Sequence, residues 1–75
     1  MSRPGRVLVV DDEFEVRSML ADYLTRNGFE AVCAEDAAAA RARLEESAYD
    51  ALLIDVSMPG ENGFSLARHV REHYD

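Results

Sequence analysis

The most informative stretch of this sequence is Arg6-Val7-Leu8-Val9-Val10-Asp11-Asp12-Glu13, a short apolar run that ends in three acidic residues. Four consecutive apolar residues, three of them β-branched, are typical of a strand that is buried on both faces, as strands of parallel sheets are. We therefore expect 6–10 to be the central strand of a sheet. The acids that follow it would then lie at the carboxyl end of that strand.

Downstream of this strand, apolar residues recur at every third or fourth position between Glu13 and Asn27, which predicts a helix with one buried stripe. The stripe comprises Val16, Met19, Leu20, Tyr23 and Leu24. We expect Asp12 to cap the start of this helix and Gly28 to end it. The next strand, about Glu30 to Ala34, is short and mixed in composition, which suits the edge of a sheet.

The second half of the chain repeats the strand and helix pattern. Asp36 is a good N-cap for an alanine-rich helix. Its shared face comprises Ala37, Ala40, Leu44 and Ala48. A third buried strand is expected at 51–54, running directly into Asp55, and a loop of turn-forming residues then leads to a last helix, about Phe64 to Tyr74.

This alternation predicts an α/β fold with a parallel sheet and crossover helices. With the strand order 2-1-3, the first and third strands are neighbours, and ligands of open parallel sheets bind where the strand order reverses. Asp11, Asp12 and Asp55 would converge there.

Three carboxylates at close range repel one another unless a cation compensates them, and oxygen ligands suit Mg²⁺ or Mn²⁺. A carboxylate left partly free is a candidate nucleophile for phosphoryl transfer.

The alternative for each acid taken alone is a helix cap or a solvated side chain, and Asp22 and Asp36 fit that interpretation. The combination of an acidic doublet after the first strand with an aspartate after the third favours a metal site instead.

The net charge of −7, with eight scattered arginines and no lysine, disfavours nucleic acid as a partner of this segment. No run reaches transmembrane length and the start lacks the apolar stretch of a signal peptide, so we expect a cytoplasmic protein without membrane contact.

Two segments, 7–13 and 52–63, resemble the signature segments of the response-regulator receiver family of two-component signalling. The resemblance implies a flavodoxin-like (CheY-like), doubly wound sheet, of which 1–75 supplies three βα units. It also implies a phosphoacceptor domain, not an enzyme, that receives its phosphoryl group from a sensor histidine kinase or a phosphotransfer protein. Asp55 would be the phosphorylated residue. Asp12 would ligate Mg²⁺ directly, Asp11 through water, and Ser57 through its backbone carbonyl.

The chain departs from the family, whose receivers have five strands in the order 2-1-3-4-5. The family's hydroxyl residue after strand four, lysine after strand five and switch aromatic have no counterpart in 1–75. A truncated chain, a partly observed chain and a half-domain completed by another chain all remain open. In each case the free edge of the third strand predicts self-association or cover by further residues.

Two other functions compete with the receiver. One is a receiver-like interaction module that never carries phosphate. The other is a haloacid-dehalogenase-like phosphatase, which places an aspartate nucleophile after its first strand and binds Mg²⁺. That family has two aspartates separated by one residue, whereas Asp11 and Asp12 are adjacent, so the phosphatase is disfavoured.

Overall fold

The computed structural model describes residues 4–55 and residue 68. Its elements are β1 (Arg6–Val10), α1 (Phe14–Arg26), β2 (Glu30–Ala34), α2 (Ala37–Glu46) and β3 (Ala51–Ile54). All three strands begin and end as the sequence predicted. The predicted helix from about Phe64 to Tyr74 lies, apart from Arg68, outside the described residues. No helix in the described part of the chain is both long and apolar enough to cross a bilayer.

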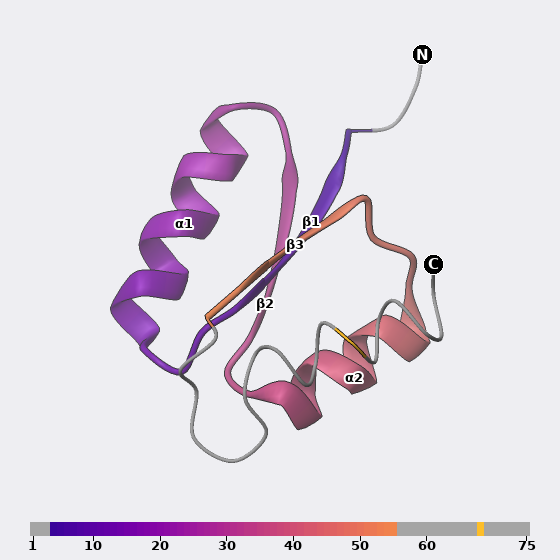
Figure 1. Cartoon of the computed structure of the whole chain (residues 1–75). Coiled ribbons are helices and arrows are strands. Elements are labelled where there is room, and N and C mark those ends of the chain that lie inside the picture. Colours follow the sequence, from indigo (N-terminus) through magenta and orange to yellow (C-terminus); the bar gives the residue numbers. More distant parts are fainter. Residues whose placement is uncertain (1–3, 56–67, 69–75) are drawn as a thin grey trace.

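The strands form a parallel sheet in the order β2-β1-β3, with β1 in the centre. The predicted α/β fold and strand order are therefore confirmed. In Figure 1 the sheet runs between α1 and α2, with α1 over one face and α2 over the other. Parallel neighbours require such crossovers, because the chain must return to the same end of the sheet before each new strand begins.

The two faces of β1 belong to two separate apolar cores. Leu8 and Val10 pack with α2, whereas Val7 and Val9 pack with Leu24 of α1. All four strand residues are at most 5% exposed, which confirms burial on both faces. This arrangement holds the carboxyl end of β1 at a defined position between the helices.

The ends of the helices are formed as local sequence dictates, with two exceptions. Asp36 caps α2 by accepting a hydrogen bond from the Ala39 backbone N–H at 2.8 Å, and Gly28 adopts a left-handed φ of +86° after α1, both as predicted. The N-cap of α1, however, is Glu13 and not Asp12, and no side chain caps that end. The other exception is Ala48, which is exposed because α2 ends at Glu46.

The predicted apolar stripe of α1 is partly wrong. Leu24 is buried and Leu20 half-buried, but Met19 and Tyr23 are more than 60% exposed. The cause is the position of the helix, which packs over β1 and β2 and leaves the β3 side uncovered within the described part of the chain.

For the same reason β3 is not the buried strand that the sequence predicted. Leu52 and Ile54 pack on the α2 side, while Leu53, on the opposite face, is 42% exposed.

Candidate functional site

Three aspartates meet where β1 and β3 end side by side. Asp11 and Asp12 follow β1 directly and Asp55 follows β3. Each of the three offers a carboxylate oxygen, and these oxygens all lie within 4.8 Å of one another. The strand order predicted this convergence. Figure 1 shows the ends of β1 and β3 together near the start of α1, at the opposite end of the sheet from the start of β1.

Backbone hydrogen bonds extend the sheet by one residue on each strand and so place the acids. The Asp11 N–H donates to the Ala34 carbonyl at 3.2 Å, and the Asp55 N–H donates to the Val10 carbonyl at 2.9 Å. Because this ladder fixes both backbones, the distance between the two carboxylates depends on the sheet rather than on a flexible loop.

The side chain of Asp11 is oriented by the turn that it begins. Its Oδ1 accepts a hydrogen bond from the Glu13 backbone N–H at 2.9 Å. An aspartate that bonds to the backbone two residues ahead stabilises a tight turn. One oxygen of Asp11 is thus engaged in the protein, which leaves less of this carboxylate for direct metal ligation.

Exposure differs among the three acids. Asp12 is exposed, whereas Asp11 and Asp55 are half-buried. Asp11 and Asp55 line an open cleft of about 540 Å³, together with Leu20 and Leu53 among other residues. The cleft is open to solvent beside Asp11 and Asp55.

The donor set fits a hard divalent cation. Two oxygens on opposite sides of one Mg²⁺ lie roughly 4.2 Å apart, since each bond is about 2.1 Å long. The largest separation of 4.8 Å exceeds this by little, so a small adjustment, or one water between an acid and the ion, completes the site. Mn²⁺ accepts the same oxygen ligands.

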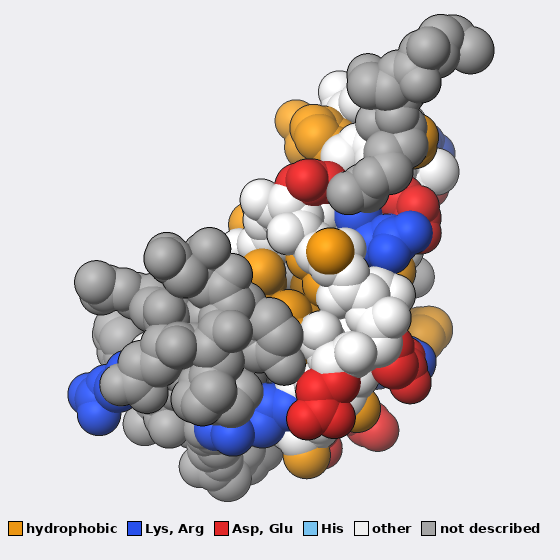
Figure 2. All heavy atoms as spheres, turned by 90° about the vertical axis from the view of Figure 1, so that its right-hand side faces the viewer, with side chains coloured by type: hydrophobic (Ala, Val, Ile, Leu, Met, Phe, Trp, Pro, Cys, Tyr) orange, Lys and Arg blue, Asp and Glu red, His pale blue; other side chains and the backbone are white. Residues whose placement is uncertain are grey.

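The remaining predicted site residue, Ser57, lies outside the described residues, as does the turn-rich loop around it. Asp22 and Asp36 have the structural roles that the sequence favoured for them. Asp22 forms an ion pair with Arg26 at 3.1 Å, and Asp36 caps α2. On the face drawn in Figure 2, the Lys and Arg colour appears in separate patches, some of them beside acidic side chains.

Sequence reasoning missed one residue that contacts this site. Nη1 of Arg17 donates a hydrogen bond to the backbone carbonyl of Asp11 at 2.8 Å. The sequence offered one weak indication of this role. A cation near the start of a helix is unfavourable beside the positive end of the helix dipole, so an arginine there suggests a contact outside the helix. Sequence alone does not show contacts to backbone carbonyls.

Comparison with known proteins gives one consistent answer. The model of the response regulator receiver domain matches residues 7–75. Protein PetR of Rhodobacter capsulatus is 43% identical over 68 residues, which cover 91% of this chain and 29% of PetR. The chain therefore spans less than a third of the length of this curated relative.

Solved structures agree. A response regulator receiver protein from Pseudomonas putida superposes with a TM-score of 0.91 at 33% identity, covering 99% of this chain and 62% of that one. The response regulator TrrA of Thermotoga maritima, crystallised with Mg²⁺ and BeF, gives a TM-score of 0.89 at 34% identity over 93% of this chain and 61% of TrrA. TrrA has also been crystallised with the histidine kinase ThkA, and that structure gives a TM-score of 0.87 at 35% identity, covering 92% of this chain and 60% of that one.

Proposed function

Since this chain belongs to the response regulator receiver family, a family of signalling rather than catalytic modules, we propose that it accepts a phosphoryl group on Asp55 in a reaction that depends on Mg²⁺. The observation that carries the proposal is the meeting of three carboxylates at the ends of β1 and β3. The binding of Mg²⁺ and BeF by TrrA supports the same role for the equivalent end of this sheet.

Each acid has a distinct part in this proposal. Asp55 supplies the nucleophilic oxygen, because it follows β3 and lies half-buried in the cleft. Asp12 ligates the cation directly, as the exposed acid without a hydrogen bond in the described structure, and Asp11 acts through water because its Oδ1 already serves the turn. The backbone carbonyl of Ser57 completes the proposed ligand set. A cation bound here would neutralise the acids and screen the incoming phosphoryl charge.

The donor we propose is a phosphohistidine of a sensor histidine kinase or phosphotransfer protein, a partner class that the complex of TrrA with ThkA supports. An Asp55 oxygen attacks phosphorus, the new O–P bond forms as the N–P bond breaks, and the departing imidazole keeps the electron pair and takes a proton from water. The product is an acyl phosphate on Asp55. No nucleic acid or membrane is needed by this chemistry.

We further propose that 1–75 makes up the first three βα units of the receiver, with strands four and five contributed from outside it. This chain matches 62% of the receiver from Pseudomonas putida and contains no lysine to replace the one that follows strand five in the family. Charge stabilisation is the main contribution of a protein to phosphoryl transfer. Phosphorylation of residues 1–75 alone should therefore be slow or absent, and tests of function need the protein at its full encoded length.

The test is incubation with a small phosphodonor and Mg²⁺, followed by intact mass measurement. We expect one phosphoryl adduct on the unmodified protein, none on Asp55→Asn, and an undiminished adduct on the control Asp36→Asn, which keeps a good helix cap. An adduct that survives in Asp55→Asn would move the acceptor elsewhere, with Asp12 as the next candidate. Rapid turnover of the donor would indicate a phosphatase, and absence of any reaction would indicate an interaction module.

A further inference from the structure

Arg17 connects helix α1 to the loop that carries the acids. Its Nη1 donates a hydrogen bond to the Asp11 backbone carbonyl, six residues earlier, at 2.8 Å. Arg17 is the fourth residue of α1, where the helix dipole disfavours a cation. The requirements of the helix therefore do not explain this residue, whereas the contact to the loop does.

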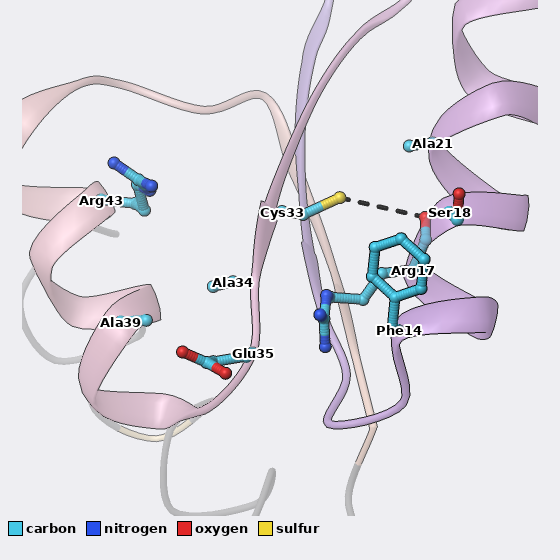
Figure 3. Close-up of a pocket in the computed structure, with 9 residues that line it drawn as sticks. All are labelled: Phe14, Arg17, Ser18, Ala21, Cys33, Ala34, Glu35, Ala39 and Arg43. Carbon is cyan, nitrogen blue, oxygen red and sulfur yellow. Dashed lines mark hydrogen bonds between the residues drawn. The ribbon is translucent and has the colours of Figure 1, made fainter.

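The surroundings of Arg17 hold its side chain in place. The ring of Phe14 lies 5.7 Å from the guanidinium carbon, within the range of a cation–π contact. Phe14 is 70% exposed and so contributes little to the core. In Figure 3 the Arg17 side chain extends from α1 toward the strands, with the Phe14 ring beside it, and the Cys33 thiol makes a long contact of 3.9 Å to the Arg17 carbonyl.

Asp11 is thereby restrained at three atoms. Its N–H is held by β2 through Ala34, its Oδ1 by the turn through Glu13, and its carbonyl by α1 through Arg17. The third restraint bears on Asp12, because the carbonyl of Asp11 and the N–H of Asp12 belong to one planar peptide group. Fixing the direction of that carbonyl fixes the direction in which the chain enters Asp12.

We propose that Arg17 is a positioning residue for the divalent-cation site: it holds the Asp11–Asp12 peptide so that the Asp12 carboxylate faces the ion. This inference rests on the proposed function. A competing role is simple charge compensation, in which the guanidinium offsets the repulsion of the acids when no metal is bound. The two roles predict opposite effects on cation affinity, because a compensating charge competes with the metal whereas a positioning contact assists it.

The experiment measures Mn²⁺ affinity from the EPR signal of the free ion, using the protein at its full encoded length. We compare the unmodified protein with Arg17→Gln, which removes the charge and the fork of donors, and Arg17→Lys, which keeps the charge and most of the stem. The control is Arg26→Gln, on the same helix, whose arginine pairs with Asp22 on the exposed surface. Loss of a residue that orients metal ligands typically weakens metal binding by about 10-fold to 100-fold.

We expect Arg17→Gln to raise the Kd for Mn²⁺ by about tenfold or more, and Arg26→Gln to leave it nearly unchanged. Arg17→Lys should raise it as well, because an ammonium lacks the planar guanidinium that lies beside the Phe14 ring and directs Nη1 at the Asp11 carbonyl. Arg17→Gln binding as tightly as the unmodified protein, or more tightly, would overturn the positioning role. If circular dichroism shows that Arg17→Gln does not fold, the comparison rests on Arg17→Lys. A Kd for Mn²⁺ that is unchanged in Arg17→Lys would then overturn the proposal. Failure of the unmodified protein to bind Mn²⁺ would instead refute the cation site itself, and with it the proposed function.

Discussion

Replacing Asp12 by asparagine should have opposite effects on stability in the absence and in the presence of Mg²⁺. The change keeps the shape of the side chain and removes its charge. Asp12 is exposed and its carboxylate forms no hydrogen bond or ion pair in the described part of the chain. The effect of the substitution on the metal-free protein should therefore come from the repulsion among the acids.

The size of this effect follows from the distances. At 4.8 Å, the largest separation in the cluster, two unit charges in water-like surroundings repel by about 0.9 kcal/mol. Asp11 and Asp12 adjoin in the unfolded chain as well, so only the repulsion between Asp12 and Asp55 is relieved in full. Asp12→Asn should thus stabilise the metal-free protein by about 1 kcal/mol at low salt, which is a rise of several degrees in the Tm of a single domain. About half of it should remain at 0.15 M salt, where the Debye length is about 8 Å.

In the presence of Mg²⁺ the unmodified protein should be more stable than Asp12→Asn, the reverse of the metal-free comparison. A ligand at about a hundred times its Kd stabilises the native state by roughly 2.7 kcal/mol, and the unmodified protein should gain this amount. Asp12→Asn has lost a proposed ligand, so its Kd rises and its gain at the same Mg²⁺ concentration falls. The unmodified protein should then be the more stable of the two.

The assay is thermal unfolding followed by circular dichroism, in EDTA and in millimolar Mg²⁺, at low and physiological salt. The control is Asp22→Asn, which removes an exposed charge from the Asp22–Arg26 pair of α1. Exposed ion pairs within a helix contribute about 0.3–0.5 kcal/mol to stability, so this variant should be destabilised by no more than that amount. Its stabilisation by Mg²⁺ should equal that of the unmodified protein. If Asp12→Asn melts no higher than the unmodified protein in EDTA and gains as much from Mg²⁺, the three acids do not form one cation site.

Three further changes test the fold that carries the site. Asp36→Ala removes the hydrogen bond to the Ala39 N–H and should cost about 1 kcal/mol in urea unfolding, whereas Asp36→Ser should cost little; equal stability of both with the unmodified protein would discount the cap. Gly28→Ala meets no atom within 4 Å, so any loss comes from the φ of +86°, and we expect about 1 kcal/mol in the same assay; a neutral result would contradict the left-handed conformation. Residues 1–75 alone should self-associate in light scattering through β3, whose Leu53 is 42% exposed, and Leu53→Lys should weaken this association; a cooperative monomer at high concentration would refute the edge argument.

The sequence predicted the three strands, two of the helix ends and the meeting of the acids. The apolar run before Asp11 marked β1, since burial on both faces leaves no polar position between Val7 and Val10. Asp36 and Gly28 marked helix ends because capping needs only the residues beside it. The convergence of Asp11, Asp12 and Asp55 followed from strand order alone, because parallel strands end at the same edge of the sheet.

Most of what failed depended on packing partners that a single sequence does not show, whereas the cap of α1, expected at Asp12 and found at Glu13, was a local error of one residue. Met19 and Tyr23 have the helical spacing of core residues, but α1 packs toward β2 and leaves them exposed. Leu53 is as apolar as its neighbours, yet its face of β3 is uncovered in the described structure. Arg17 was missed because its partner is a backbone carbonyl, and the sequence pattern does not show which carbonyls lie within reach.

The most direct test of the central claim is to locate the phosphoryl group chemically. An acyl phosphate on aspartate is reduced by borohydride to homoserine, whereas a free carboxylate is not. After treatment of the full encoded protein with a phosphodonor and Mg²⁺, reduction and peptide sequencing by mass spectrometry should find homoserine at Asp55 and aspartate at Asp11 and Asp12, with no conversion when EDTA replaces Mg²⁺. Homoserine at Asp11 or Asp12 with Asp55 intact, or equal conversion of Asp55 in EDTA, would contradict the account.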